Sequence, residues 1–279
     1  MSAGGSADGA AAGAVSSTML LAVGVVGGLL CIYLSSFLGN LFGPVIAAIG
    51  AVLAIVWGSD AIRRVASYGL GTGVPSIGYM SLSVGVISAL AGLSLTTTNF
   101  LSGFLGKNAI LAGPIAAFVI AVIIGAIIAI VATKIVGMKI PIMLQCTIEI
   151  AGAATLSILG FAVAIAGALD VTAIYQNVVA TGLIAVLFIM CTMAIQHPFN
   201  ACLGPNEDQV RTLKCAASTA FLSMTIVGLL CAVTGGLAWF IVLIVGLIGW
   251  IISFRAFVMA SINDAASTKW AGLWPKVEQ

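Results

Sequence analysis

Charge is what this sequence lacks most. Charged residues make up 6% of its 279 residues, whereas a soluble domain contains roughly 25%. So few charges cannot cover the surface of a soluble fold of this length. Because 62% of the residues are hydrophobic, lipid must be the solvent over most of the folded chain.

Further absences exclude other classes of protein. His197 is the single histidine, and the six cysteines lack the spacing of a metal-binding motif, so no metal site built from histidine or cysteine is expected. The chain has no basic patch that would bind nucleic acid. No Lys or Arg precedes the first apolar run, which argues against a secretory signal peptide. Residues 1–17 are expected to form a flexible tail.

The sequence is rich instead in apolar runs of about 20 residues, each long enough to cross a bilayer core of about 30 Å. A helix satisfies its own backbone hydrogen bonds, as lipid requires. We therefore predict an all-α fold: a polytopic membrane helix bundle over residues 18–257, with a cytoplasmic tail over residues 258–279. The eight expected spans are Thr18–Leu38, Pro44–Trp57, Ile77–Leu95, Ile110–Ala132, Ile140–Ala164, Asn177–Ile195, Ala216–Val233 and Leu237–Phe257.

The positions of the cations predict the orientation of the bundle. Lys and Arg are enriched in the cytoplasmic segments of membrane proteins. With the N-terminus inside, nine of the ten cations lie on the cytoplasmic side and only Lys107 lies outside. Both termini and the polar loops 58–76 and 196–215 are then cytoplasmic, and Trp57 is expected near the inner interface. The nine cations are Arg63, Arg64, Lys134, Lys139, Arg211, Lys214, Arg255, Lys269 and Lys276.

Glu149 is the ionisable residue that stands out within a span. It follows Lys139 by ten positions, about 15 Å along a helix, which places it near the membrane midplane. A carboxylate there needs a cation, a hydrogen-bond donor or water. Gln145 lies one turn earlier on the same face and Thr147 adds a hydroxyl, so these residues are candidates for a cation path, with Na⁺ at Glu149. A carboxyl group that only ties this helix to a neighbour explains the residue equally well.

Arg63 and Arg64 precede a glycine-rich stretch, residues 69–75. Its spaced glycines are similar to a phosphate-binding loop, but no strand precedes them and no Gly-Lys-Ser/Thr follows, which argues against nucleotide binding. An irregular connection beside two arginines can still hold an anion at a helix start. The alternative is a cytoplasmic loop whose cations only set the orientation of the bundle.

The longest polar interval between apolar spans runs from His197 to Cys215. Pro198 is expected to end the sixth span, and the acidic pair Glu207-Asp208 fits the first turn of a helix that leads into the seventh. Helix capping explains the acidity, but not the whole combination of imidazole, amides, Gly-Pro and acidic pair. The residues that make this interval a candidate cytoplasmic face are His197, Asn200, Asn206, Glu207, Asp208, Arg211 and Lys214.

Two strings in these polar stretches identify a family that the chain resembles, the C subunit of tetrahydromethanopterin S-methyltransferase, a membrane complex of methanogenic archaea. The chain's length and expected helix count fit this family as well, so the resemblance covers essentially the whole sequence. The strings are Ala66-Ser67-Tyr68-Gly69-Leu70-Gly71-Thr72-Gly73-Val74-Pro75-Ser76-Ile77-Gly78 and His197-Pro198-Phe199-Asn200-Ala201-Cys202-Leu203-Gly204-Pro205-Asn206-Glu207-Asp208.

The resemblance implies a function that composition does not show. In that complex a methyl group passes from methyl-tetrahydromethanopterin through a corrinoid to coenzyme M, and the transfer drives Na⁺ outward across the membrane. The resemblance also implies that the corrinoid is held by a partner subunit. This chain, which alone binds no cofactor, would then lie in lipid beside two sister membrane subunits, away from the catalytic centre.

We therefore expect Arg63, Arg64 and the 197–215 interval to form a cytoplasmic face that meets the corrinoid domain or binds anionic coenzyme M. Glu149 and Gln145 are expected on or beside the cation path. Two alternatives stay open: a stand-alone secondary transporter for a small anion that contacts Arg63 and Arg64, and a purely architectural subunit whose sister chains hold the ion path.

Overall fold

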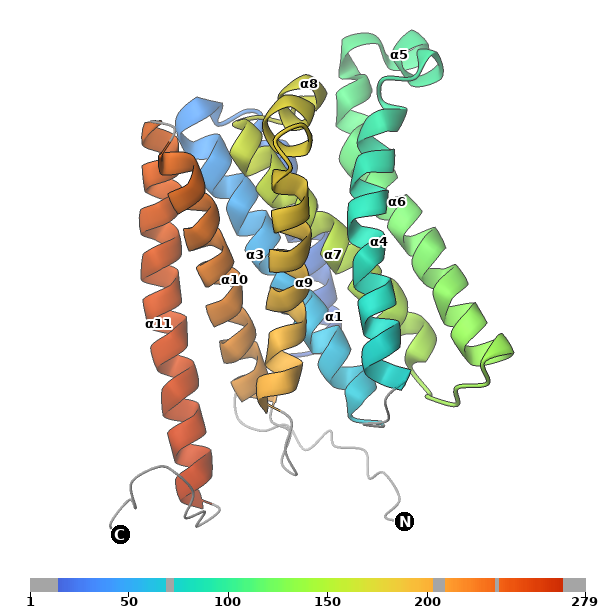
Figure 1. The fold of residues 1–279 in the computed structure, drawn as a ribbon, viewed down its shortest axis with the longest axis vertical. Helices are drawn as coiled ribbons and strands as arrows, with labels where there is room; N and C mark the ends of the chain where they lie inside the picture. The colour runs from blue at the N-terminus through green and yellow to red at the C-terminus, as the bar shows by residue number, and fades with distance from the viewer. Residues whose placement is uncertain (1–14, 69–72, 203–208, 234–235, 268–279) are drawn as a thin grey trace.

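The structure, a computed structural model, describes residues 15–68, 73–202, 209–233 and 236–267. Every regular element within them is a helix, and the long helices stand side by side in one bundle (Figure 1). The elements are α1 (Ser17–Ala22), η1 (Val23–Gly27), α2 (Gly28–Ser35), α3 (Gly39–Ala66), α4 (Gly73–Leu95), α5 (Asn99–Leu105), η2 (Gly106–Asn108), α6 (Ala109–Ile130), η3 (Val131–Ile135), α7 (Met143–Ala166), α8 (Val171–Ile174), η4 (Tyr175–Val179), α9 (Leu183–Cys202), α10 (Gln209–Ala232) and α11 (Leu237–Ser267).

The number of membrane spans agrees with the apolar runs. Among the described residues, seven helices are long and apolar enough to cross a membrane, and an eighth span results if Val171–Val179 and Leu183–Phe199 count as one. These two pieces meet at an 84° bend, where Gly182 takes a φ of 79°, a conformation that glycine adopts without strain. The prediction of an all-α, multi-pass membrane bundle is confirmed for the described residues.

Several helices extend into the segments that were expected to be polar loops. The second span was predicted over Pro44–Trp57, yet α3 runs for 28 residues and includes residues 58–66. Its charged last turn continues the helix because Asp60 pairs with arginines on the same helical face. Residues 196–202 belong to α9, which continues past Pro198, and residues 209–215 belong to α10. The expected boundary at Phe257 lies inside α11.

The core of the bundle is built around α7. In the most apolar 18-residue stretch of α7, 94% of the residues are buried. The helix packs against α3, α4, α6 and α9. Glycine permits this close approach, since a Cβ on Gly160 would lie 2.8 Å from the Ala47 carbonyl oxygen of α3. By contrast, only 28% and 17% of the residues are buried in the equivalent 18-residue stretches of α6 and α11, so these helices turn most of their surface outward.

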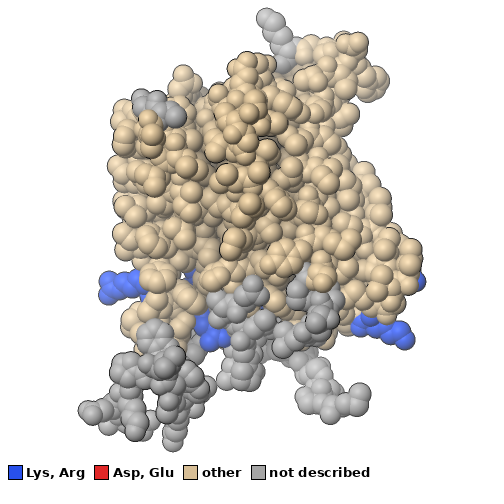
Figure 2. Space-filling model, in the orientation of Figure 1, with Lys and Arg blue, Asp and Glu red and all other residues tan. Residues whose placement is uncertain are grey.

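Most of the positive charge lies at one end of the bundle. Among the side chains that Figure 2 describes, Lys and Arg appear only at the lower end of the face shown. Lys107 belongs to η2, which follows α5 at the opposite end in Figure 1. The positive-inside rule therefore makes the lower end cytoplasmic. The chain termini, Lys269 and Lys276 lie outside the described residues, but Val15 hydrogen-bonds the start of α10, and α11 runs down to this end.

Candidate functional site

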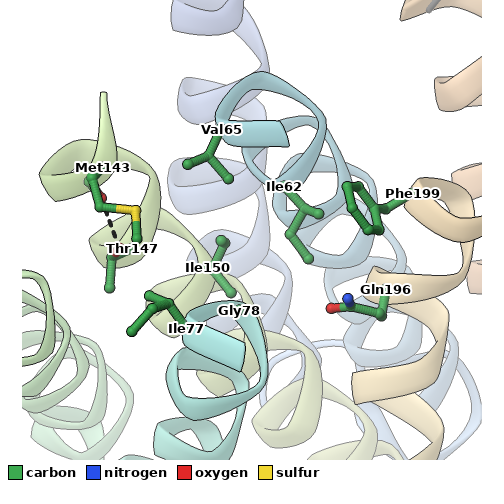
Figure 3. Close-up of a pocket in the computed structure, with 9 residues that line it drawn as sticks. All are labelled: Ile62, Val65, Ile77, Gly78, Met143, Thr147, Ile150, Gln196 and Phe199. Atoms are coloured by element: carbon green, nitrogen blue, oxygen red, sulfur yellow. Dashed lines mark hydrogen bonds between the residues drawn. The ribbon is translucent and has the colours of Figure 1, made fainter. Parts of the chain in front are cut away.

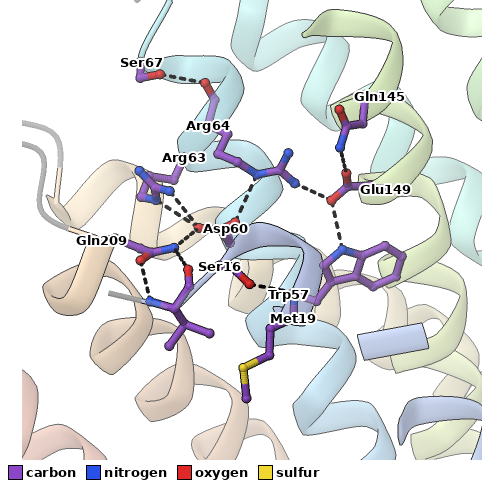
Figure 4. A network of polar contacts seen from close by, with 11 residues as sticks. Ser16, Met19, Trp57, Asp60, Arg63, Arg64, Ser67, Gln145, Glu149 and Gln209 are labelled. Atoms are coloured by element: carbon purple, nitrogen blue, oxygen red, sulfur yellow. Dashed lines mark hydrogen bonds and ion pairs between the residues drawn. The ribbon is translucent and has the colours of Figure 1, made fainter. Parts of the chain in front are cut away.

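A group of charged side chains is buried at the cytoplasmic end of α3 (Figure 4). Asp60 is fully buried. Its Oδ1 accepts hydrogen bonds from Arg63 Nε at 3.0 Å and Nη2 at 2.9 Å, and its Oδ2 accepts from Arg64 Nε at 3.0 Å. Both arginines lie in the last turn of α3, where the helix dipole also favours cations. This pairing offsets the cost of burying the Asp60 charge.

Glu149 of α7 joins this group through Arg64. Arg64 Nη2 donates to Glu149 Oε2, so one guanidinium binds carboxylates on two helices. The same Oε2 accepts from Trp57 Nε1 at 2.9 Å, and Oε1 accepts from Gln145 Nε2 at 2.8 Å. Only 4% of Glu149 is exposed, and protein donors satisfy both of its oxygens.

We call Asp60, Arg63, Arg64 and Glu149 the charge quartet. Its two carboxylates and two guanidinium groups make it neutral overall, which suits a site at the edge of the hydrocarbon region. The charges are shared unevenly, because Asp60 contacts both arginines whereas Glu149 contacts only Arg64. Within the described part of the chain, Glu149 therefore has a single cationic partner.

Gln209, the first residue of α10, connects the quartet to the cytoplasmic surface. Its Nε2 donates to Asp60 Oδ1 at 3.1 Å and to Val15 O at 2.9 Å, while its Oε1 accepts from Val15 N at 3.1 Å. α10 begins directly after residues 203–208, which lie outside the described residues. A displacement at the start of α10 would thus remove a hydrogen bond from Asp60.

The expected cation-path residues are only partly together. Glu149 and Gln145 are hydrogen-bonded, whereas Thr147 donates its hydroxyl to Met143 O at 2.7 Å, within its own helix. Glu149 is also closer to the cytoplasm than the sequence indicated. Because α7 begins at Met143, Glu149 lies only six residues, about 9 Å, from the helix start, and not near the midplane.

The residues of the expected cytoplasmic face fall into separate sets. Arg63 and Arg64 are part of the quartet. His197 is exposed on α9, and Arg211 and Lys214 are partly buried in the first turns of α10. The residues of this face whose side chains lie outside the described part of the chain are Asn200, Asn206, Glu207 and Asp208.

Three members of the polar network were not among the expected site residues. Asp60 could have been identified from the sequence, since it precedes the two arginines by three and four residues, the spacing of paired charges on a helix. Trp57 was expected at the membrane interface but is 2% exposed and bonded to Glu149. Gln209 binds Asp60 although the two residues are 149 positions apart in the chain, and no local sequence pattern predicts that contact.

A small pocket lies beside the quartet, between the cytoplasmic ends of α3, α4, α7 and α9 (Figure 3). Its volume of about 10 Å³ is close to what one water molecule needs. Gln196 Oε1 is buried there and has no hydrogen-bond partner among the described residues. A buried oxygen of this kind in a membrane protein needs a hydrogen-bond donor that is small enough to fit in the pocket. The pocket is lined by Ile62, Val65, Ile77, Gly78, Met143, Thr147, Ile150, Gln196 and Phe199.

Radical footprinting tests whether this pocket holds water. Met143 lines it and is 1% exposed, while Met224 is 0% exposed and lies elsewhere. Irradiation of the assembled protein is expected to oxidise Met143 but not Met224, because radicals form from the water bound beside Met143. Replacing Gln196 with Leu removes the polar atom and should abolish the oxidation of Met143. Equal protection of the two methionines before the substitution would contradict a bound water.

The atoms that suit a monovalent cation in this site are carboxylate and amide oxygens, the ligands that hard cations prefer. Glu149 has carboxylate oxygens at the cytoplasmic end of α7, and Gln145 beside it turns its amide nitrogen toward Glu149 Oε1. Among the described residues, no three His, Cys, Asp or Glu side chains gather in the manner of a metal centre.

Comparison with known proteins gives one consistent result. A family model for the C subunit of tetrahydromethanopterin S-methyltransferase matches residues 1–278. The chain is 53% identical over 273 residues to that subunit from Methanothermobacter thermautotrophicus and 54% identical over 273 residues to that from Methanothermobacter marburgensis, covering 98% of each chain in both pairs. It is 47% identical over 280 residues to the subunit from Methanosarcina mazei, covering 100% of this chain and 99% of the relative.

Proposed function

The chain belongs to the family of the tetrahydromethanopterin S-methyltransferase C subunit, and we propose that it helps to couple methyl transfer to Na⁺ movement across the membrane. The methyl group passes from methyl-tetrahydromethanopterin through a corrinoid to coenzyme M, and Na⁺ is the cargo. In this proposal a partner subunit holds the corrinoid and carries out the chemistry. This chain contributes a part of the cation path and the cytoplasmic face that the corrinoid domain meets.

One observation carries this proposal: an unbroken series of hydrogen bonds from the cytoplasmic surface into the bundle. The series runs from Gln209 to Asp60, from Asp60 to Arg64 and from Arg64 to Glu149. A partner that displaces the start of α10 thereby changes the donors around Asp60 and, through Arg64, those around Glu149. Coupling requires such differential contacts in the two states of the partner.

The outer surfaces of the bundle indicate where lipid and sister subunits lie. α6 and α11 expose large apolar side chains along their length, among them Ile123, Ile127, Ile248 and Ile252. Such surfaces suit lipid or the apolar helices of other membrane subunits. We assign them to the two sister membrane subunits and to the surrounding lipid.

Replacing both Arg211 and Lys214 with Ala tests the cytoplasmic face. Both residues lie at the start of α10, close to the expected approach of the corrinoid domain or of anionic coenzyme M. The rate of methyl transfer to coenzyme M in the purified complex is expected to fall by about tenfold, as for the loss of one charge-assisted contact of about 1.5 kcal/mol. Arg255→Ala, on exposed α11, is the matched control. Reduced yield of the complex with an unchanged rate would assign the face to docking alone.

A stand-alone anion transporter receives less support from the same contacts. In that alternative Arg63 and Arg64 bind the substrate, but both guanidinium groups already bind carboxylates of this chain. Purification separates the two functions. An affinity-tagged chain is expected to bring down corrinoid-containing partners from native membranes, whereas a stand-alone transporter would be recovered without them.

A further inference from the structure

Arg64 already occupies the position that a cation bound to Glu149 would need. In the structure its Nη2 donates to Glu149 Oε2 and its Nε donates to Asp60 Oδ2 at 3.0 Å. We infer that Arg64 is a tethered competitor of the transported cation: Na⁺ binds Glu149 in exchange for the Arg64 guanidinium. This inference rests on the proposed function, since it specifies how the cation site at Glu149 is controlled.

Charge balance favours exchange over simple addition. The quartet is neutral as it stands, so a Na⁺ added beside Arg64 would leave one uncompensated positive charge among side chains that are mostly buried. Such a charge is costly at this depth. If the Arg64 guanidinium leaves Glu149 as Na⁺ arrives, the carboxylate keeps a single cationic partner throughout.

The uneven sharing of charge in the quartet allows Arg64 to leave. Asp60 also binds Arg63 through two hydrogen bonds and Gln209 through a third. It therefore remains paired when the Arg64 guanidinium moves away. Glu149 has no second cationic partner among the described residues, so it is the member of the quartet whose pairing changes.

The local geometry offers an alternative position for the Arg64 side chain and an additional oxygen ligand for Na⁺. Arg64 lies two residues before the end of α3 and is 13% exposed, so its long side chain can extend to the cytoplasmic water. Gln145 is exposed at the other side of Glu149. Rotation of its amide would present an oxygen, in place of the nitrogen, to a cation on the carboxylate.

Sodium titration of reconstituted complexes tests the exchange. Vesicles carry the parent complex, the Arg64→Gln variant or the Arg64→Lys variant, and methyl-transfer-driven Na⁺ uptake is measured against Na⁺ concentration, with choline keeping the ionic strength constant. Arg64→Gln removes the competing charge and should lower the half-saturating Na⁺ concentration by about fivefold or more. Arg64→Lys keeps a tethered charge and should stay closer to the parent. An unchanged or raised half-saturating concentration in Arg64→Gln would overturn the inference.

A second measurement uses the unsubstituted complex, in case Arg64→Gln does not assemble. Modification of arginines by phenylglyoxal, located by mass spectrometry, should increase at Arg64 when Na⁺ replaces choline. The exposed Arg255 reports on reagent access and should react equally in both salts. Modification of Arg64 that does not depend on Na⁺ would refute the exchange.

The failure of this inference is distinguishable from that of the proposed function. If Glu149→Gln transports Na⁺ normally, the proposed cation path through this chain is wrong. If Glu149→Gln is inactive but Arg64→Gln has the parent's half-saturating concentration, the path stands and only the exchange is wrong.

Discussion

Replacing Glu149 with Gln is expected to lower methyl-transfer-driven Na⁺ uptake by about tenfold or more, the equivalent of losing a charge-assisted contact of about 1.5–3 kcal/mol. Glutamine has the size of glutamate, and its amide oxygen can still accept hydrogen bonds from Trp57 or Arg64. Arg64 also keeps its bond to Asp60. The complex should therefore assemble while the negative charge that attracts a cation is gone. Uptake by reconstituted vesicles, normalised to the amount of complex, is the measurement.

Thr155→Val is the matched control for this substitution. Thr155 is buried on the same helix, and its hydroxyl donates to Ala151 O within α7. Because this hydrogen bond lies within α7 and involves no member of the quartet, uptake should remain at the parent level. Normal uptake by Glu149→Gln together with a lower yield of complex would show that Glu149 ties α7 to α3 without lying on the path, and would favour an architectural subunit.

Replacing Asp60 with Ala is expected to have the largest effect on stability. Asp60 accepts four hydrogen bonds from Arg63, Arg64 and Gln209. Without it, two guanidinium groups face each other with only Glu149 as a partner. Breaking a buried ion pair from one side costs about 3–5 kcal/mol, a large share of the 5–15 kcal/mol or so that stabilises a typical domain. The amount of this chain recovered in the assembled complex should fall severely.

Asp170→Ala is the control that measures how much recovery of the complex falls when a carboxylate outside the quartet is removed. Asp170 is exposed, and its side chain caps α8 by accepting from Ala173 N at 2.6 Å. Loss of such a cap costs about 1 kcal/mol, so recovery should decrease only slightly. Similar recovery of the Asp60 and Asp170 variants would contradict the role of Asp60 as the centre of the quartet.

The fold was largely predictable because the features that mark membrane spans and their orientation are local in the sequence. Runs of apolar residues mark the spans, and the cations mark the cytoplasmic side. Predictions failed where tertiary pairing overrides a local pattern. The charges at 60, 63 and 64 suggest a loop, but in the structure Asp60 pairs with both arginines on one helical face and α3 continues through them. The bend at Gly182 lies inside the span expected over Asn177–Ile195, and a single glycine in an apolar run does not predict it.

The site was predictable as separate parts but not as a whole. Glu149 and Gln145 share a helical face, and this spacing is visible in the sequence. The Arg64–Glu149 pair and the Trp57–Glu149 bond join residues 85 and 92 positions apart. Such contacts depend on how α3 packs against α7, which the spacing of residues along either helix does not reveal. The sequence therefore placed the two arginines and Glu149 in distinct sites, whereas the structure joins them in one.

The division of the quartet between two helices has a consequence for how the chain is made. During synthesis α3 enters the membrane before α7 exists, and at that stage its end carries Asp60, Arg63 and Arg64 with a net charge of +1. Positive charge at a helix end holds that end in the cytoplasm. Glu149 arrives 85 residues after Arg64 and cancels the excess when α7 docks. The same arginine thus directs topology in the nascent chain and becomes a neutralised, mostly buried contact in the finished subunit.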